Sequence, residues 1–283
     1  MTRPSPTAAR RQVGRALVEL REAAGRTRED AAEILECSPS KISRLETGLG
    51  APSAGDLALL LDLYHATSEQ RAEVQDLSRA ARQRRPRTNH GVAVPGWFRR
   101  YVGLEEAASE LRTYTGELIS GQLQTADYAR ALISSYPPNQ PADVERLVEG
   151  RMARAAMLHK PDALHLWAIM SEAALRILVG GRVVMRDQLA HLLEMAELPS
   201  VTMQIVPFGR GAHPAIGFAF SVMRFPDGGN DVVYLEELTL ASYLDRADDP
   251  QREAYVTVWE STVKAALDAK ESVRLVDSVR REL

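Results

Sequence analysis

The stretch that decides the fold of the first part of the chain is Ser38-Pro-Ser-Lys-Ile-Ser-Arg-Leu-Glu-Thr-Gly48. Ser38 is a residue type that caps helices, and Pro39 fits the first helical position because no backbone N–H is needed there. Ile42 and Leu45, three residues apart, predict a buried stripe, and Gly48 is typical of a helix end. The stretch therefore predicts a short amphipathic helix.

Signals for four more helices flank this one. On its N-terminal side, Gly25 closes a first helix, and Thr27 caps a second with Asp30 in a capping-box position. On its C-terminal side, Pro52-Ser53 opens a fourth helix and Ser68 a fifth. Apolar residues at helical spacing predict a shared core, namely Val13, Leu17, Leu20, Ala24, Ala31, Ala32, Leu35, Leu57, Leu60, Leu61 and Tyr64. Five short helices with tight turns predict a compact all-α domain.

This order of helices, with Ser38–Gly48 followed by Pro52, resembles the helix-turn-helix domain of phage-repressor-type (XRE, or Cro/CI-like) regulators over roughly residues 10–67. The resemblance implies a lambda-repressor-like fold whose third helix lies in the DNA major groove, with its N-terminal residues against base edges. We therefore expect a sequence-specific, DNA-binding transcriptional regulator. The resemblance places these residues against DNA: Arg28, Pro39, Ser40, Lys41, Ser43 and Arg44.

The DNA-facing residues differ in the contacts expected of them. Arg44 is the best candidate for a base contact, because a guanidinium can bind O6 and N7 of guanine through two hydrogen bonds. Lys41 and Ser43 are candidates for phosphate contacts instead. Arg28 stands where many relatives carry Gln at the start of the second helix, which also suggests a phosphate contact.

Two residues of the motif are expected to be structural. Glu46 points back toward the first helix, where the family usually has a basic residue and this chain has Arg21, so the resemblance implies an Arg21–Glu46 ion pair. Cys37 is expected to be a small buried turn residue rather than a redox-sensing thiol. Because it is the single cysteine, an internal disulfide and a Cys-rich zinc site are excluded.

The charge distribution separates the chain into two parts. Residues 1–88 carry 15 Arg or Lys and 12 Asp or Glu, whereas the remainder carries 20 and 26. This asymmetry is typical of a DNA-binding module attached to a part that does not touch DNA. We predict a helix-turn-helix domain at residues 1–78, a basic linker at 79–94 and a second domain at 95–283. The linker is either an arm that follows the phosphate backbone or the solvated end of the fifth helix.

The second domain combines helical and strand-like segments. Leu164–Met170 predicts a central strand, and the alternation in Val201–Val206 predicts a half-buried one. Phe218–Phe225 and Val232–Leu235 flank a turn signal that starts at Pro226 and should pair as a hairpin. Helices are predicted at about 104–113, 126–136, 142–158, 185–197, 250–268 and 271–281. The chain as a whole is predicted to be α+β, with a larger mixed α/β domain and a small sheet after the helical domain.

Five segments of the second domain carry a further resemblance: Gly121–Ala129, Ser171–Leu175, Gln204–Phe208, Gly211–Pro214 and Val233–Glu236. They are similar to the domain of unassigned biochemical function that follows this helix-turn-helix in many actinobacterial regulators. The resemblance implies a domain that senses a ligand or binds a partner, a small acidic protein encoded beside the regulator being one expectation. The first candidate contacts are Gln122, Gln124, Tyr128 and His213.

The sequence favours a binding protein over an enzyme. Glu172, His213 and Glu236 could serve acid–base chemistry, but metal-ligand spacing, a phosphate loop and a nucleophile motif are missing from the sequence. We therefore expect no catalysis, no cofactor and no metal. The sequence also lacks a long apolar run and a signal peptide, which predicts a cytoplasmic protein that does not contact a membrane.

The expected partner is double-stranded operator DNA, bound by a homodimer with half-sites about one helical turn apart. One alternative is a monomer that binds DNA weakly until a partner dimerises it. Another is an antitoxin-like or scaffold protein that acts mainly through protein–protein contacts. The exposure of Ser40, Lys41 and Arg44 would favour DNA binding over pure scaffolding.

Overall fold

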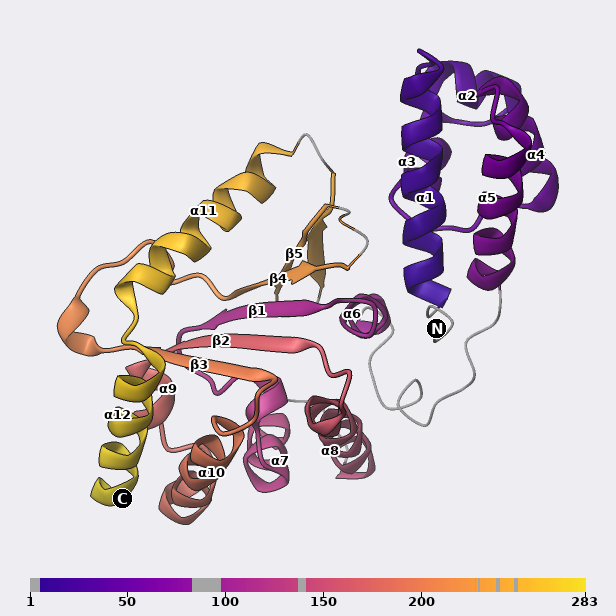
Figure 1. Ribbon diagram of the computed structural model, residues 1–283. Helices are drawn as coiled ribbons and strands as arrows, with labels where there is room; N and C mark the ends of the chain where they lie inside the picture. The colour runs from indigo at the N-terminus through magenta and orange to yellow at the C-terminus, as the bar shows by residue number, and fades with distance from the viewer. Residues whose placement is uncertain are drawn as a thin grey trace. The chain divides into compact units, whose positions relative to one another are not determined.

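The computed structural model describes residues 6–82, 98–136, 141–226, 228, 230–237, 240–246 and 249–283. The chain divides into two compact units, one built on residues 1–86 and the other on most of residues 87–283 (Figure 1). Most of the predicted basic linker, including Arg84 and Arg85, lies outside the described residues, as do Asp227 and Gly229 of the predicted turn.

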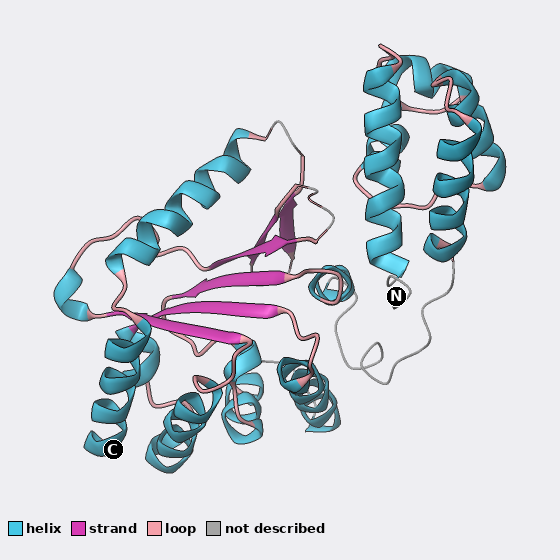
Figure 2. Cartoon of the chain, in the orientation of Figure 1, coloured by secondary structure: helices cyan, strands magenta, loops and turns pink. Residues whose placement is uncertain are grey.

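The first unit folds into the five helices that the sequence predicts (Figure 2). A complete capping box of Thr27 and Asp30 starts the second helix, as predicted. Gly25 and Gly48 adopt left-handed φ angles of 63° and 72°, which only glycine adopts without strain. Ser38 occupies the N-cap position of the third helix, but its side chain makes no capping hydrogen bond. The helices are α1 (Pro6–Ala23), α2 (Arg28–Ile34), α3 (Pro39–Glu46), α4 (Ala54–Leu63) and α5 (Ser68–Ala81).

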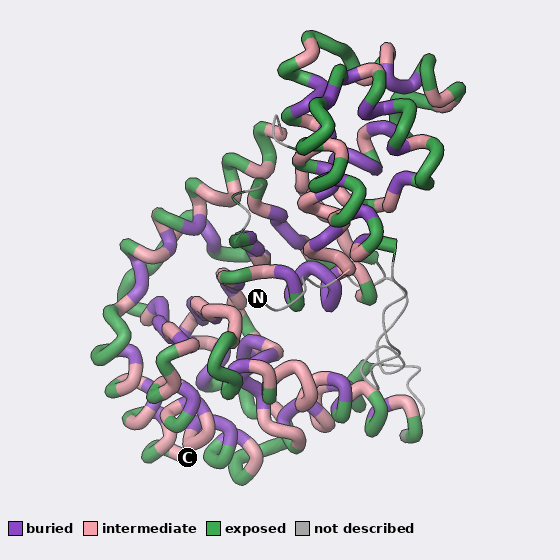
Figure 3. The backbone as a smooth tube through the Cα atoms, turned by 45° about the vertical axis from the view of Figure 1, so that its right-hand side comes forward, coloured by how far each residue is buried: buried purple, intermediate pink, exposed green. Residues whose placement is uncertain are grey.

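The core of the first unit forms where the apolar stripes of these helices meet. Leu17 of α1, Ile42 of α3 and Leu61 of α4 are each exposed by no more than 1 %. Figure 3 shows buried residues recurring at short intervals along the helices, as amphipathic helices require. Burying each such side chain contributes about 1.5–3 kcal/mol, so the core supplies most of the driving force for folding of this small unit.

The backbones of α1 and α3 approach closely at Gly14. A Cβ atom placed on Gly14 would lie 2.3 Å from the carbonyl oxygen of Glu46 and 2.7 Å from that of Leu45. Both atoms belong to the backbone at the end of α3, so neither can rotate away. The crossing of α1 and α3 therefore requires glycine at this position.

A buried ion pair joins three helices beside this crossing. The carboxylate of Glu46, whose side chain is 2 % exposed, accepts hydrogen bonds from Nε of Arg21 at 2.6 Å and Nε of Arg28 at 2.7 Å. Burial is the largest single influence and would lower the pKa of Arg21, but the hydrogen bond to Glu46 and the negative charges of Glu46 and Glu22 together raise that pKa, so the guanidinium stays charged. The expected Arg21–Glu46 pair is present, and Arg28 joins it.

The second unit is built on a six-stranded mixed sheet with the strand order β3-β2-β1-β4-β5-β6. β1, β2 and β3 run parallel, whereas β4, β5 and β6 are antiparallel to their neighbours. The strands are β1 (Glu110–Thr115), β2 (His165–Ser171), β3 (Val201–Val206), β4 (Phe220–Arg224), β5 (Val232–Glu236) and β6 (Ala241–Leu244).

Helices cover both faces of this sheet. The connections from β1 to β2 and from β2 to β3 step in the same direction, so right-handed crossovers place their helices on one face. Figure 1 shows α7, α8, α10 and α12 on that side and α11 on the other, where Trp259 is buried in an apolar cluster with Tyr114 and Ile169. The helices are α6 (Arg99–Glu105), α7 (Ala126–Ser134), α8 (Pro141–Ala155), α9 (Glu172–Arg176), α10 (Gly181–Met195), α11 (Pro250–Ala265) and α12 (Ala269–Glu282), with short 3₁₀ turns at Gly121–Leu123, Ala156–His159 and Phe208–Arg210.

The structure confirms the predicted hairpin and corrects two other predictions. The helix predicted at about 104–113 is wrong, because α6 ends at Glu105 and residues 110–115 form β1, where strand pairing on both sides outweighs helical spacing. The half-buried character predicted for Val201–Val206 is also wrong. Five of its six residues are buried because both sheet faces are covered, and Gln204 is satisfied by Trp167 and the carbonyl of Leu267.

The close approach at Gly14 predicts whether the substitution Gly14→Ala raises or lowers the free energy of unfolding. Helix propensity alone would stabilise the protein by about 0.5–1 kcal/mol. We expect destabilisation by about 1–3 kcal/mol instead, because the methyl group meets backbone oxygens. The measurement is urea unfolding followed by far-UV circular dichroism. Gly55→Ala is the control, since its Cβ would meet only Ser53 Oγ at 3.9 Å and should be neutral or stabilising; stabilisation by Gly14→Ala would contradict the packing described.

The buried ion pair predicts that Glu46→Gln lowers the free energy of unfolding of the first unit by roughly 3 kcal/mol, because two arginines lose their charged partner and Arg21 is buried. Glu19→Gln breaks an exposed pair with Arg15 and should cost less than about 1 kcal/mol. Tryptophan fluorescence separates the units, because Trp97, Trp167 and Trp259 all follow residue 86. Glu46→Gln should shift the dichroism transition of the helical unit and leave the fluorescence midpoint in place; equal effects of the two substitutions would contradict the role of Glu46.

Candidate nucleic-acid interface

The turn between α2 and α3 sets the direction of α3. Glu36 in this turn has a left-handed φ of 47°, and the backbone N–H of Cys37 donates to the carbonyl of Ala32 at 2.9 Å. Cys37 is half-buried and packs against the core, which agrees with the turn role expected of it. The chain then enters α3 at Pro39, so that α2 and α3 form a helix-turn-helix.

One face of α3 is buried and the opposite face is open to solvent. Ile42 and Leu45 pack into the core and are no more than 5 % exposed. The predicted DNA-facing residues lie elsewhere on the helix: Pro39, Ser40, Lys41 and Arg44 are exposed, and Ser43 is half-buried. Arg44 lies four residues after Ser40 and three after Lys41, so it neighbours both on one side of the helix. The structure therefore gathers these three residues into one accessible surface.

The basic groups around this surface are not equally available. Arg28 donates to Glu46, and its side chain is 36 % exposed. Lys41 binds Asp56 of α4 with 3.0 Å between Nζ and Oδ2, and this bond lowers the pKa of Asp56 and raises that of Lys41. Arg44 has no hydrogen-bond or ion-pair partner for its guanidinium among the residues that the structure describes. The N–H donors of this guanidinium are therefore free to bind an acceptor on another molecule.

Sequence reasoning missed two of these contacts. Arg28 was expected at a phosphate, and the structure shows Glu46 as its partner within the chain. Asp56 carried no signal as a partner of Lys41, because its place three residues after Ser53 marks it as a residue of the first helical turn. Both contacts depend on how the helices cross, which spacing along the chain does not report.

The candidate contacts of the second unit fall into two groups. Gln122, Gln124 and Tyr128 are at most 4 % exposed and hold the chain around Ile119. Gln124 donates to the carbonyl of Ile119 at 2.7 Å, the hydroxyl of Tyr128 accepts from its N–H at 3.1 Å, and Gln122 donates to the hydroxyl of Tyr101 at 3.2 Å. These three side chains satisfy buried polar groups of the fold. Of the four, His213 lines a cavity of the second unit, and Gln122, Gln124 and Tyr128 do not line it.

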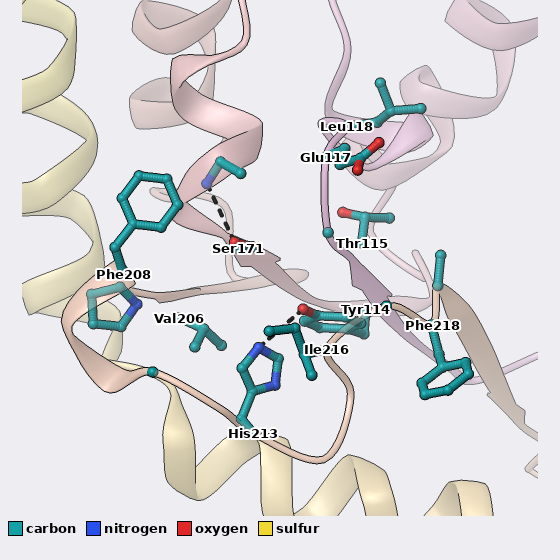
Figure 4. Close-up of a pocket in the computed structure, with 16 residues that line it drawn as sticks. Tyr114, Thr115, Glu117, Leu118, Ser171, Val206, Phe208, His213, Ile216 and Phe218 are labelled. Atoms are coloured by element: carbon teal, nitrogen blue, oxygen red, sulfur yellow. Dashed lines mark hydrogen bonds between the residues drawn. The ribbon is translucent and has the colours of Figure 1, made fainter.

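This cavity measures about 560 Å³ and lies where β1, β2 and β3 end (Figure 4). Nε2 of His213 lies 3.3 Å from the hydroxyl of Tyr114, and burial lowers the pKa of His213. Nδ1 of His213 and Oγ1 of Thr115 are buried without a hydrogen-bond partner. The cavity is lined by residues 114–118 at the end of β1 and beyond it, Ser171, Ala173, residues 206–208 at the end of β3 and beyond it, Gly211, His213 and residues 216–219 before β4.

The carboxylates considered for acid–base chemistry have partners within the second unit. Glu172 accepts from the backbone N–H of Phe208 at 2.8 Å and from Nε of Arg176 at 2.7 Å. Glu236 accepts from the hydroxyl of Tyr234 at 2.8 Å. These bonds give both carboxylates a structural role. Across the described ranges, no cluster of three or more His, Cys, Asp or Glu side chains could hold a metal ion.

Two family models match separate parts of the chain. Residues 12–74 match the helix-turn-helix domain family, which confirms the predicted motif. Residues 98–278 match a domain of unknown function, DUF5753. No curated protein and no solved structure gives a significant match. Within the part of the chain that the structure describes, no helix is long and apolar enough to cross a membrane. Because the second match covers more than half of the chain, the protein belongs to the DUF5753 family and carries a DNA-binding helix-turn-helix domain before that family's domain.

Proposed function

We propose that the protein is a sequence-specific transcriptional regulator that recognises its operator through the exposed face of α3. The availability of Arg44 carries this proposal. Arg21, Arg28 and Lys41 are each held by a carboxylate of the first unit, whereas the exposed guanidinium of Arg44 is unpaired among the described residues. An exposed arginine on this helix can form two hydrogen bonds to one guanine, which distinguishes that base pair from the others.

The remaining residues of the surface would position α3 on the duplex. Pro39 and Ser40 stand at the helix N-terminus, the end that approaches base edges in this motif. Lys41 can turn from Asp56 to a phosphate at little cost, because an exposed ion pair contributes only about 0–1 kcal/mol. Arg28 keeps donors beyond its Nε, so it can bind Glu46 and a phosphate together. Ser43 is half-buried and would contribute at the edge of the surface.

We assign the regulator to the phage-repressor (XRE) type found in actinobacteria, acting in the cytoplasm as a DNA-binding protein. The second domain would regulate by binding a ligand or a small, acidic partner protein rather than by catalysis. The internal bonds of Glu172 and Glu236 support a binding role, because a general acid or base must be free to meet its substrate.

The availability of Arg44 predicts that Arg44→Ala removes the preference for operator DNA. Loss of a bidentate guanine contact removes roughly 1–3 kcal/mol of discrimination, which is about 5- to 150-fold in the ratio of affinities. The measurement is fluorescence anisotropy of the full chain with DNA from its own promoter and with unrelated DNA, each at two salt concentrations. Binding to unrelated DNA should change much less, because that binding rests mainly on phosphate contacts.

Arg182→Ala is the matched control, because it removes the same charge from an exposed site on α10 of the second unit. It should preserve the preference for promoter DNA. Equal and weak binding to both DNAs, unaffected by Arg44→Ala, would contradict the proposal and favour the antitoxin-like or scaffold alternative.

A homodimer is the second expectation of the proposal, because helix-turn-helix domains of this type bind two half-sites one helical turn apart. Light scattering of the free protein at micromolar concentration should give twice the chain mass of 31.2 kDa. Separating the promoter half-sites by an extra half turn should then abolish tight binding. A strictly monomeric protein at that concentration would contradict the dimer and favour a regulator that a partner dimerises.

A further inference from the structure

The topology of the second unit forms a crevice at one edge of its sheet. β1, β2 and β3 are parallel, so their carboxyl ends at Thr115, Ser171 and Val206 meet at the same edge. After β3 the chain returns to the other side of β1 and enters β4. Open sheets bind ligands at such a switch in strand order, because the connections diverge there and leave a gap. The cavity of about 560 Å³ lies at this edge, and its volume falls within the range typical of small-molecule sites.

The walls of the cavity are mainly apolar. Phe208, Ile216 and Phe218 line it and are 58 %, 57 % and 61 % exposed, although large apolar side chains are usually covered. Figure 4 shows the rings of Phe208 and Phe218 on opposite sides, with Ile216 and Tyr114 between them. Three exposed apolar residues around one cavity mark a surface that binding would cover.

Two polar atoms stand unpaired within these walls. Oγ1 of Thr115 and Nδ1 of His213 are buried without a hydrogen-bond partner, and both residues line the cavity. Buried polar atoms are normally satisfied, so a rotation of either side chain that turns this atom into the cavity would let a bound molecule complete it. A hydroxyl or carbonyl group offers the donors and acceptors needed.

The charges around the cavity argue against an anionic ligand. The 16 lining residues, all within the described ranges, include no Lys or Arg, so an anion would lack a counter-charge. Glu117 is the charged residue among them and is exposed to solvent. Burial lowers the pKa of His213, so its imidazole is neutral at pH 7 and adds no charge.

We propose that this cavity is a binding site for a small, uncharged aromatic or alicyclic molecule whose hydroxyl or carbonyl groups bind Thr115 and His213. The apolar walls would hold the ring, and the two unpaired polar atoms would orient it. This inference deepens the proposed regulatory role of the second domain and rests on it only for the consequence of binding.

The test uses the full chain and N-phenyl-1-naphthylamine, an uncharged aromatic probe whose fluorescence rises in apolar surroundings. The wild-type protein should bind it saturably, one molecule per chain. Gly116→Phe and Ala219→Trp should each weaken binding more than tenfold by filling the cavity, since Gly116 lines it and a Cβ there meets no atom within 4 Å. Gly121→Phe is the matched control outside the cavity, where a Cβ is equally unobstructed, and should bind as the wild type does.

Displacement of the probe then identifies the ligand class. 2-Naphthol should displace the probe more effectively than naphthalene. Thr115→Val should weaken the binding of 2-naphthol about three- to tenfold, because one hydrogen bond is lost, and should leave the binding of naphthalene unchanged. Absence of saturable binding, or wild-type affinity in both cavity-filling variants, would overturn the site. Tighter displacement by naphthalene-2-sulfonate than by 2-naphthol would overturn the uncharged class.

The proposed cavity site and the proposed DNA recognition can be contradicted independently of each other. Arg44→Ala should leave the probe titration unchanged, because Arg44 belongs to the first unit. Loss of operator preference in Arg44→Ala with probe binding retained supports both proposals. A wild-type protein that prefers its promoter but binds no probe would overturn the cavity alone.

Discussion

The carboxylate of Glu46 holds together the three helices on which DNA recognition depends. It is the last residue of α3, and it binds Arg21 from α1 and Arg28 from α2 while almost fully buried. A buried charge without a partner is strongly destabilising, so these helices are stable together in one arrangement. Gly14 constrains the same crossing sterically, because a side chain there would collide with the backbone of Glu46. The exposed face of α3 therefore has a fixed orientation before DNA is bound.

The same arrangement decides which cations remain available to a ligand. Four basic residues lie on or beside α3, and carboxylates within the first unit bind three of them. Arg44 is the exception among the described residues, although by residue type it does not differ from Arg28. Pairing, rather than residue type, separates the candidate base contact from the residues that support it. A regulator built in this way could change Arg44 without disturbing its fold, because the bracing charges lie elsewhere.

The sequence predicted those parts of the fold that local chemistry determines. Thr27 and Ser53 are residue types that cap helix starts, and Gly48 is one that ends a helix in a left-handed conformation. In the structure, Thr27 and Ser53 cap α2 and α4, and Gly48 has a left-handed φ just after α3. Residues 104–113 were mistaken for a helix because β1 is stabilised by strands that lie far away in the sequence. Gln124 and Tyr128 resembled ligand contacts because they are polar residues in a recognisable segment, yet burial commits them to Ile119. The burial of polar side chains and the pairing of distant segments are the two properties that spacing does not encode.

The cavity of the second unit shows how far sequence reasoning reaches. The sequence marks His213 as a candidate contact but does not mark Thr115, and only the return of the chain from β3 to β4 brings the loop that carries His213 to the end of β1. Three of the segments that carry the family resemblance, Ser171–Leu175, Gln204–Phe208 and Gly211–Pro214, contribute residues to its walls. These segments therefore serve the cavity as well as the fold. Three recognisable segments around one apolar cavity, together with the internal hydrogen bonds of Glu172 and Glu236, favour the proposed small-molecule site over a catalytic one.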